Sequence, residues 1–352
     1  MKVEKKIIGI LGGGQLGKML STAANKLGFD CHIFDPDINS PAKAISKYQT
    51  TSEYTDKKKI KTFAKKCHLI TYEFENIPTK TIKYIEKYCS VFPKANALSI
   101  SQDREKEKEF FQNLSLDVVP YNLIKNKSER NFKSINVKFP AILKTCRNGY
   151  DGKGQKTVNN KKELAEAFKE LSYVDCILEE KINFNKEISI IISRDVEGNV
   201  VCYEPGENKH SSGILKKTTV PAKITSDLKH KAILIAGKLV NSLNYIGVMG
   251  IEFFVENEHL FLNEIAPRVH NTGHWTQDGC LIDQFEQHIR CISNLPIGDG
   301  KRYADVEMVN LLGSEVESIS KFKNNSVYIY GKSEIKQGRK MGHVNIIKKG
   351  VI

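Results

Sequence analysis

Two glutamates in the last third of the chain have a spacing that suits a divalent cation. Glu252 and Glu264 lie in the apolar segments GIEFFV and LFLNEIAP, which are predicted to form the two arms of a β-hairpin. A three-residue loop at 257–259 sets Glu252 opposite Glu264, whereas a two-residue loop pairs Glu252 with Asn263. We favour the first register, because strand alternation then puts both carboxylates on one face. Two carboxylates so close need a cation, and their hard oxygen atoms suit Mg²⁺. The apolar neighbours disfavour the alternative, a solvent-facing pair.

Lys144 is the second candidate, because it lies on a predicted apolar strand, FPAILKTC, directly before a glycine-rich segment, RNGYDGKGQ. A lysine held on a strand can reach nucleotide phosphates as a point charge. A glycine loop can lay its N–H groups over a terminal phosphate. The loop lacks the G-K-[ST] ending of a P-loop. Taken alone, the pattern is equally typical of a lysine at a strand end before a surface turn.

Gly12, Gly14 and Gly17 form a G-x-G-x-x-G pattern between a predicted strand and a predicted helix, with Asp35 farther on. This is the dinucleotide-binding fingerprint, whose glycines allow a tight turn and whose helix-start N–H groups attract an anion. Any phosphate suits such a site, so the pattern alone indicates NAD only weakly. We favour anion binding without NAD, and the remaining alternative is that the glycines only shape the turn.

The segment 267–276, PRVHNTGHWT, places many hydrogen-bond donors directly after Glu264. So many donors beside a cation site indicate an anionic substrate, and the alternative is a hydrogen-bonded structural loop. His210 has a weaker case, because a lone histidine in a polar loop is more often structural. The donors in the segment are Arg268, His270, Asn271, His274 and Trp275.

The elements that must position these residues begin with an N-terminal α/β domain at 1–97. Buried strand patterns alternate there with helical ones, which implies a parallel sheet with helices on both faces. The predicted strands are 7–11, 31–35, 68–72 and 91–93, and the predicted helices are 18–27, 57–66 and 79–89.

The rest of the chain has an α+β pattern rather than a repeat of the first domain. An amphipathic helix is predicted at 99–114, and the tail from residue 301 is predicted to form mostly short strands. We therefore place a second domain at 98–297 and a β-rich C-terminal domain at 298–352. The other predicted elements are strands 139–146 and 176–180, helices 161–171 and 227–243, and hairpins 188–204 and 250–265.

Composition excludes several classes of protein. No apolar run approaches the roughly 18 residues that span a bilayer, and the basic N-terminus lacks the cleavage pattern of a secretion signal. The eight cysteines contain no C-x-x-C pair, which argues against zinc and favours reduced thiols in the cytoplasm. The net charge of +13 comes from lysines spread along the chain, so we expect a solvated surface and no nucleic-acid partner.

Taken together, these motifs resemble the ATP-grasp superfamily and, within it, the N5-carboxyaminoimidazole ribonucleotide synthetase family of purine biosynthesis. The resemblance runs nearly end to end, and its most specific pieces are NGYDGKGQ (148–155) and APRVHNTGHWT (266–276). The other pieces are GGGQLGKM (12–19), YEFENI (72–77), QDR (102–104), EEKINFNKE (179–187), ENKHSSGIL (207–215), QFEQHIR (284–290) and MGHVNI (341–346). It implies a Rossmann-like pre-ATP-grasp domain, an ATP-grasp domain with a lid subdomain at 136–182, and a small β-rich domain. It also implies a cytoplasmic homodimer that uses ATP and Mg²⁺, with Mn²⁺ as a substitute.

The reaction that the resemblance implies begins with attack of bicarbonate on the γ-phosphate of ATP, which gives carboxyphosphate and ADP. Carboxyphosphate, or the carbon dioxide that it releases, then carboxylates the exocyclic amine of aminoimidazole ribonucleotide. We expect no covalent nucleophile, because positioning and electrostatics carry such chemistry. The general base stays open between His270 and the released phosphate.

Residue roles follow from the same resemblance, position by position. Lys144, Arg268 and His270 are expected to act in catalysis, and Glu252 and Glu264 to hold the metal. The expected ATP-binding residues are Arg104, Lys144, Gly149, Tyr150, Asp151, Gly152, Lys153, Gly154, Gln155, Glu179, Glu180, Lys181, Ile182, Glu187, His210, Asn263 and Glu264. The expected substrate-binding residues are Gln15, Leu16, Glu73, Tyr150, Asp151, Arg268, Asn271, Lys332 and Arg339.

Three other functions compete with this interpretation. A formate-dependent glycinamide ribonucleotide transformylase would keep the same ATP machinery. An NAD-dependent dehydrogenase is a remote alternative that depends on Gly12 to Gly17 and Asp35. A nucleic-acid-binding protein is supported only by the positive charge, and the scatter of the lysines argues against it.

Overall fold

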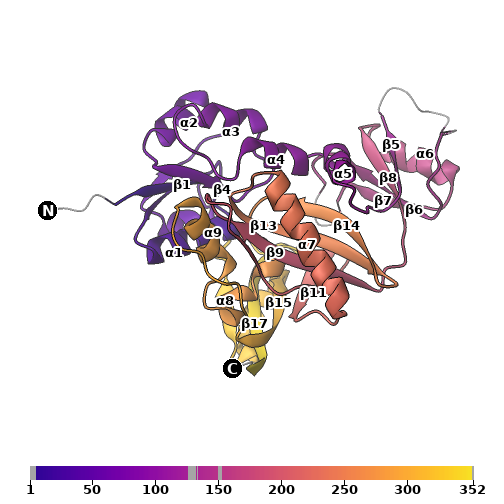
Figure 1. The fold of residues 1–352 in the computed structure, drawn as a ribbon. Helices are drawn as coiled ribbons and strands as arrows, with labels where there is room; N and C mark the ends of the chain where they lie inside the picture. Colours follow the sequence, from indigo (N-terminus) through magenta and orange to yellow (C-terminus); the bar gives the residue numbers. More distant parts are fainter. Residues whose placement is uncertain (1–4, 126–131, 133, 150–152, 351–352) are drawn as a thin grey trace.

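The computed structural model describes residues 5–125, 132, 134–149 and 153–350, and these residues form three β-sheets with helices packed against them. Figure 1 shows the N-terminal sheet at one end, a small sheet that projects at the other end, and a large sheet between and below them. None of the described helices is both long and apolar enough to cross a membrane.

The N-terminal sheet is parallel, which confirms the predicted α/β class of this part. Its order is β3-β2-β1-β4, and β1 and β2 are largely buried because helices cover the sheet, with Asp30 and His32 of β2 as buried polar residues. The sequence analysis missed β3, which is short and half exposed, and 91–93 forms only a parallel bridge from Val91 to Ile70. The strands are β1 (Ile7–Leu11), β2 (Asp30–Phe34), β3 (Tyr48–Thr50) and β4 (Leu69–Tyr72); the helices are α1 (Gln15–Lys26), η1 (Pro41–Ile45), α2 (Lys57–Ala64) and α3 (Thr79–Ile85).

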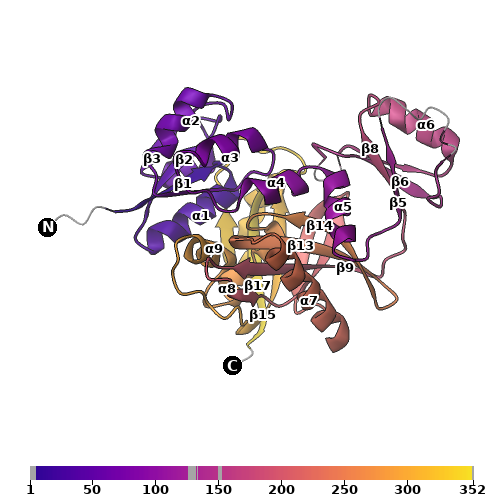
Figure 2. The same ribbon diagram turned by 45° about the horizontal axis from the view of Figure 1, so that its top comes forward.

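The predicted single helix at 99–114 is wrong, because two helices, α4 (Ala95–Ser101) and α5 (Arg104–Asn113), occupy this region. Asp103 takes an extended backbone conformation and its side chain accepts a hydrogen bond from the Glu105 N–H, so it is the N-cap of α5. The break lets α5 take a direction of its own, and Figure 2 shows it between the small sheet and the large one.

The small sheet is antiparallel, with order β5-β8-β6-β7, and α6 packs on it. Its own core includes Leu143, Leu164, Phe168 and Leu178. One of its strands, β5, lies before residue 136, where the lid was predicted to begin. The elements are β5 (Tyr121–Ile124), β6 (Ala141–Thr145), β7 (Gln155–Val158), α6 (Lys161–Glu170) and β8 (Cys176–Glu180).

The large sheet has the order β14-β13-β9-β11-β12-β15-β17-β16, with β10 paired to β9, and α7 packs on β9. It runs across the predicted boundary between 297 and 298, because β12 pairs with β15. The tail strands β15 and β17 are nine and eleven residues long, so the prediction of short strands is wrong for them. The strands are β9 (Lys186–Arg194), β10 (Val200–Cys202), β11 (Gly206–Ser211), β12 (Ile214–Val220), β13 (Gly247–Glu256), β14 (His259–Ala266), β15 (Ala304–Leu312), β16 (Ser326–Ile329) and β17 (Lys340–Gly350); the helices are α7 (Ser226–Ser242), η2 (Asn271–Gly273), α8 (Thr276–Gly279), α9 (Gln284–Ile292) and η3 (Gly313–Phe322).

Candidate active site

The β13–β14 hairpin brings the two predicted metal ligands together. Glu252 pairs with Glu264 across the hairpin, which is the predicted pairing. The predicted three-residue loop is nevertheless wrong, because only Asn257 and Glu258 connect the strands, both with positive φ. A bulge at Asn263 shifts the register by one residue and restores the pairing of the two glutamates.

Negative charge is concentrated at this pair. Burial raises the pKa of Glu252 well above its ordinary value, and the negative charges of Glu264 and Glu187 raise it further. His270 Nε2 lies 3.9 Å from Glu252 Oε1. Its pKa is lowered well below the ordinary value by burial and by Arg268, so the imidazole is neutral. A cation would relieve the repulsion between the carboxylates, so the residues fit Mg²⁺. Among the described residues no three histidine, cysteine or acidic side chains form a metal-binding group, so phosphate oxygens would have to complete the ligand set.

Helix α5 supplies further charged groups to the same place. Arg104 Nη1 lies 3.4 Å from Glu264 Oε2, and Glu107 Oε1 accepts a 2.9 Å hydrogen bond from the Ile265 N–H. Burial and the charge of Glu264 raise the pKa of Glu107 to about 8. Arg104 and Glu107 are three residues apart on one helix face, so α5 contacts β14 at the carboxylate pair.

Lys144 points to the same cluster from β6 and forms a close ion pair with Glu179 of β8. The second oxygen of Glu179 lies 3.0 Å from Lys108 Nζ, and both residues of this second pair are buried. Burial lowers the pKa of Lys144, although Glu179 opposes that shift. Two residues that were predicted to contact ATP, Lys144 and Glu179, are therefore partners of each other in this structure.

The remaining nucleotide-side residues lie around these two clusters. Glu187 Oε2 is 3.1 Å from His210 Nδ1, so the two predicted residues are close together. Glu180 Oε1 accepts from the Lys138 N–H at 3.1 Å, and the Lys181 N–H donates to the Pro140 carbonyl at 3.0 Å, which ties the end of β8 to the start of β6. Ile182 follows β8 and is half-buried.

The predicted glycine loop begins and ends in the small sheet. The carbonyl of Gly154 accepts a 2.9 Å hydrogen bond from the Thr145 N–H, and Gln155 of β7 pairs with Lys144 of β6. Gly149 lies close to the backbone of Lys153, so the described ends of the loop approach each other. Tyr150, Asp151 and Gly152 lie outside the described residues.

The glycine turn before α1 uses its own donors within the chain. The N–H groups of Gly12, Gly13 and Gly14 donate to the Phe34 carbonyl, to Asp35 Oδ2 and to Glu73 Oε1, at 3.0, 2.6 and 2.7 Å. Two carboxylates thus occupy donors that a dinucleotide pyrophosphate needs, which disfavours the NAD alternative. The first N–H groups of α1, from Gln15 and Leu16, have no partner within a helix and stay suited to a phosphate.

Glu73 and Arg268 connect this turn to the carboxylate pair. Burial raises the pKa of Glu73 to about 7, while the Gly14 N–H, Arg268 and Lys332 oppose the shift. Arg268 forms a close ion pair with Glu75. Burial raises the pKa of Glu75, Arg268 opposes this shift, and the charge of Glu264 adds to it. Arg268 therefore lies between the predicted substrate side and the predicted metal side.

Two further predicted residues, Lys332 and Arg339, lie on the connection between β16 and β17, and only Lys332 is near the turn. Lys332 Nζ donates to the Lys340 carbonyl at 2.7 Å, and Arg339 Nη1 donates to the Glu334 carbonyl at 3.2 Å. Lys332 acts on the pKa of Glu73, whereas no contact between Arg339 and the turn is present among the described interactions.

The segment 267–276 divides into two parts. Arg268 and His270 face the charged cluster, but Asn271 forms two amide hydrogen bonds with Asn310 of β15, at 3.1 and 2.6 Å. This amide therefore holds the loop to the large sheet, and a contact of Asn271 with the substrates stays a prediction. His274 and Trp275 are buried in the core, where His274 packs on His343.

Sequence reasoning missed Glu75, Glu107, Lys108 and Lys340. Lys340 acts on the pKa values of Glu252 and His270, so its charge faces the carboxylate pair. Lys108 could have been found, because it follows Arg104 by four residues and such residues share a helix face. No comparable signal was available for Lys340, because only the strand pairing of the tail brings it here.

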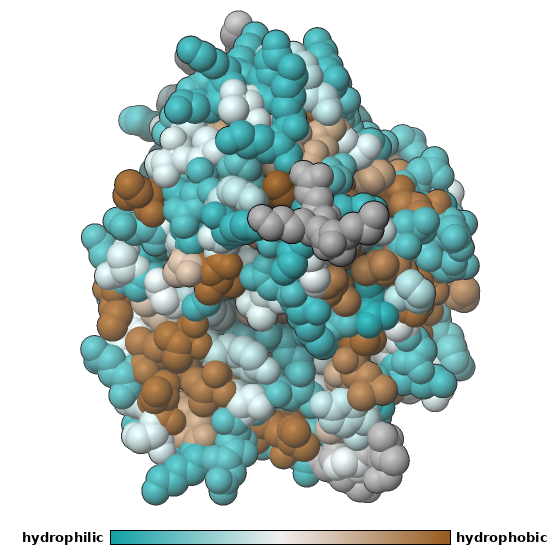
Figure 3. Space-filling model, turned by 90° about the vertical axis from the view of Figure 1, so that its left-hand side faces the viewer, coloured by the Kyte–Doolittle hydropathy of each residue, from teal (hydrophilic) through white to brown (hydrophobic). Residues whose placement is uncertain are grey.

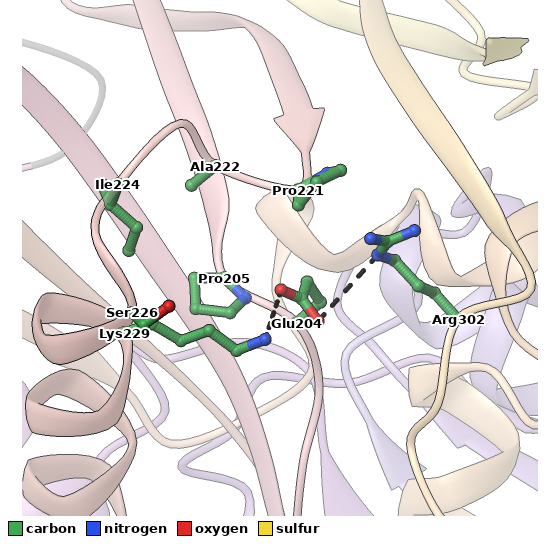
Figure 4. A pocket seen from close by; sticks show the side chains of 8 residues that line it. All are labelled: Glu204, Pro205, Pro221, Ala222, Ile224, Ser226, Lys229 and Arg302. Atoms are coloured by element: carbon green, nitrogen blue, oxygen red, sulfur yellow. Dashed lines mark hydrogen bonds and ion pairs between the residues drawn. The ribbon is translucent and has the colours of Figure 1, made fainter. Parts of the chain in front are cut away.

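A separate hollow of about 240 Å³, shown in Figure 4, lies between the β10–β11 connection, the end of β12 and the start of α7. Three charged residues line this hollow and pair with one another: the Glu204 carboxylate lies 2.6 Å from Lys229 and 3.9 Å from Arg302. None of the residues singled out from the sequence lines it, so it is not the candidate active site.

The raised pKa of Glu73 leads to a testable effect of pH on stability. The native state holds the Glu73 proton more tightly than the unfolded chain does, so stability falls as the pH rises from the ordinary value of 4.5 to about 7. We expect Glu73→Gln to remove this contribution, roughly 2–3 kcal/mol between pH 5 and pH 8. Urea unfolding of the ligand-free protein at several pH values measures the difference.

The matched control for this measurement is Glu53→Gln, because Glu53 is an exposed glutamate of the same domain. Its unfolding free energy should run parallel to that of the wild type across the range. Parallel curves for wild type and Glu73→Gln would show that Glu73 is ionised in both states, contrary to this argument.

Comparisons with known proteins cover nearly the whole chain. Family models for the ribonucleotide synthetase preATP-grasp domain, the ATP-grasp domain and the phosphoribosylaminoimidazole carboxylase C-terminal domain match residues 5–102, 109–285 and 307–351. The N5-carboxyaminoimidazole ribonucleotide synthase of Bacillus subtilis (strain 168) is 39% identical over 348 residues, which cover 97% of this chain and 92% of that protein.

Solved structures give the same result. A crystal structure of the ADP complex of an N5-carboxyaminoimidazole ribonucleotide synthetase is 38% identical with a TM-score of 0.93, and the match covers 99% of this chain and 94% of that one. The Aspergillus clavatus synthase in complex with ADP and 5-aminoimidazole ribonucleotide is 29% identical with a TM-score of 0.91, covering 98% and 94%. The similarity therefore includes all three sheets.

Proposed function

The chain belongs to the N5-carboxyaminoimidazole ribonucleotide synthase family, and from that premise we propose how its residues divide the reaction between them. The enzyme is an ATP-dependent ligase that carboxylates 5-aminoimidazole ribonucleotide with bicarbonate to N5-carboxyaminoimidazole ribonucleotide. The observation that supports our assignment best is the convergence of Glu252, Glu264, Arg104 and Lys144 between α5, the β13–β14 hairpin and the small sheet.

ATP binds between the small sheet and the large sheet. The adenine and ribose lie along the end of β8 and Glu187, and the phosphates extend toward Lys144 and Arg104. Glu252 and Glu264 would hold Mg²⁺, with Mn²⁺ as a substitute, and the ion would supply positive charge to the transferred phosphoryl group. When ATP arrives, Lys144 exchanges part of its contact with Glu179 for a phosphate oxygen, which a flexible lysine stem permits.

Bicarbonate is held by Arg268, whose guanidinium lies between the carboxylates of Glu73 and Glu75 and the metal side. An oxygen of bicarbonate attacks the γ-phosphorus, the bond to the β-phosphate oxygen breaks, and ADP leaves as carboxyphosphate forms. Arg268 stabilises the negative charge of this intermediate, and the glycine loop excludes water that would hydrolyse it.

The ribonucleotide phosphate is held by the first N–H groups of α1, from Gln15 and Leu16, together with Lys332 and Arg339. Its exocyclic amine then attacks the carboxyl carbon of carboxyphosphate or of the carbon dioxide released from it, and phosphate leaves. Neutral His270 orients the carboxyl group, and either His270 or the released phosphate takes the amine proton.

One experiment tests the function against its nearest alternative. ADP release is measured with ATP and Mg²⁺, either with bicarbonate and aminoimidazole ribonucleotide or with formate and glycinamide ribonucleotide. We expect release that depends on both members of the first pair. Release that depends on formate and glycinamide ribonucleotide instead would contradict the assignment and identify a transformylase.

We also propose that the enzyme acts as a cytoplasmic homodimer without a nucleic-acid or membrane partner. Figure 3 shows groups of apolar side chains on one face of the molecule, interrupted by hydrophilic ones, and Leu281 and Ile38 are 85% and 70% exposed. Apolar groups of this kind support association with a second copy of the chain. Light scattering at micromolar concentration tests it, and a monomeric mass would contradict the proposal.

A further inference from the structure

Lys108 is a fully buried charged residue that the reaction described above does not use. It lies on α5, one turn after Arg104, and its side chain has no exposed area. Its ammonium lies 3.0 Å from Glu179 Oε1 and donates a 3.1 Å hydrogen bond to the Asn263 carbonyl. A buried ammonium is costly unless such partners compensate it, so these two contacts define its place.

The two partners of Lys108 belong to different sheets. Glu179 is on β8 of the small sheet, whereas Asn263 is the bulged residue of β14 directly before Glu264. Helix α5 lies between the two sheets in Figure 2, and Lys108 reaches both from it. The side chain therefore joins the part that holds the nucleotide base to the part that holds the carboxylate pair.

Charge balance gives this contact a second consequence. Burial alone would raise the pKa of Glu179, but Lys108, Lys144 and Arg104 hold it well below its ordinary range. Glu179 is therefore an ionised carboxylate that two ammonium groups share. One negative charge cannot neutralise both lysines, so a positive charge remains available to nucleotide phosphates. Without Lys108, the charge of Glu179 would be left to Lys144 and Arg104, and Lys144 would have to give up more of its contact with Glu179 to meet a phosphate.

We propose that Lys108 is a positioning residue for ATP: it shares the charge of Glu179 so that Lys144 can engage the phosphates, and it aligns the small sheet with the Glu252–Glu264 pair. This inference rests on the proposed location of ATP between the two sheets. It assigns no contact with substrate to Lys108 itself. Its effect should consequently be confined to ATP and leave the ribonucleotide site unchanged.

The test replaces Lys108 by methionine, which keeps the length of the side chain and removes its charge. We expect the KM for ATP to rise at least tenfold, the KM for aminoimidazole ribonucleotide to stay within twofold, and kcat to fall less than the KM for ATP rises. Lys106→Met is the matched control, because Lys106 is an exposed lysine on the same helix, and its constants should not change. Lys108→Arg keeps the charge and should hold the KM for ATP within about threefold of the wild type.

A double variant distinguishes charge sharing from simple loss of packing. The double variant Lys108→Met with Glu179→Gln removes both charges of the pair, so its rise in the KM for ATP should be smaller than the product of the rises in the two single variants. Equal increases in the KM values for ATP and for aminoimidazole ribonucleotide, or a double variant whose rise equals that product, would overturn the inference. If Lys108→Met does not fold, a tenfold rise in Lys108→Arg would overturn it equally. A wild type that lacks ribonucleotide-dependent turnover would instead refute the proposed function, and calorimetric titration with ADP would still compare the variants.

Discussion

Glutamine in place of Glu252 or Glu264 is expected to lower kcat by about 10²- to 10³-fold, which is the scale for loss of one group that stabilises transition-state charge. Each change keeps the shape of the side chain but removes one of the two negative charges that we assign to the metal. Glu252 is buried and faces Glu187 and Glu264, whereas Glu264 also compensates Arg104 at 3.4 Å. We therefore expect Glu264→Gln to weaken ATP binding in addition, because Arg104 loses the carboxylate that positions its guanidinium. Bicarbonate- and ribonucleotide-dependent ADP release, measured over a range of Mg²⁺ concentrations, checks both variants.

The matched control is Glu258→Gln, at the turn of the same hairpin and at the far end from the carboxylate pair. Glu258 is exposed and accepts a hydrogen bond from Thr225, so its loss should leave kcat and the Mg²⁺ dependence unchanged. The metal assignment also requires that both active-site variants need more Mg²⁺ for half-maximal activity. Variants with at least half the wild-type kcat and an unchanged Mg²⁺ requirement would refute it.

The hairpin also shows what alternation along a strand can and cannot predict. The pattern of apolar residues predicted both strands of the hairpin and the glutamate on each of them, because burial of one strand face selects apolar residue types. The two-residue loop and the bulge at Asn263 compensate each other, so the pairing of Glu252 with Glu264 was predicted from the wrong loop. The position of a bulge depends on the contacts of its extra residue, and here the carbonyl of Asn263 accepts a hydrogen bond from Lys108.

Other errors have an equally local cause. The break before α5 depends on the capping side chain of Asp103, which the continuous helical pattern of the surrounding residues conceals. The N-terminal parallel sheet was predictable, because apolar residues make up most of its buried strands β1, β2 and β4. Strand β12 was not, since ILKKTTV mixes charged and apolar residues, and its place is set by pairing with β11 and β15.

The site itself was predictable to the extent that neighbours in sequence are neighbours in space. Arg268 and His270 follow Glu264 directly, and the structure keeps them at the cluster. The pairing of Lys144 with Glu179 joins residues 35 positions apart, and Lys340 approaches Glu252 only because β17 pairs with β15. Contacts of this kind depend on strand order, which residue types alone do not encode.

Arg268→Met is expected to lower kcat/KM by about 10²-fold or more, because Arg268 carries the positive charge that lies between the two halves of the site. Its guanidinium pairs with Glu75, donates a 2.8 Å hydrogen bond to the Val269 carbonyl, and acts on the pKa of Glu73. Removing it leaves the buried Glu73 and the half-buried Glu75 without this cation and removes the group that would hold carboxyphosphate. Arg268→Lys should recover little activity, since an ammonium lacks the planar fork that can bind a carboxylate on two atoms. Steady-state ADP release with and without aminoimidazole ribonucleotide separates loss of carboxyphosphate formation from loss of its use.

Arg194→Met is the control that makes this result interpretable. Arg194 ends β9 and hydrogen-bonds to Asn241 and to the Tyr245 carbonyl, so its removal takes an arginine from the same sheet without touching the charged cluster. If Arg268 acts through charge at the reacting groups, only Arg268→Met lowers turnover strongly, while thermal unfolding of the two variants stays comparable. If both variants lose activity in proportion to their loss of stability, Arg268 has a structural role, and the charge that stabilises carboxyphosphate must come from Lys144 and Arg104.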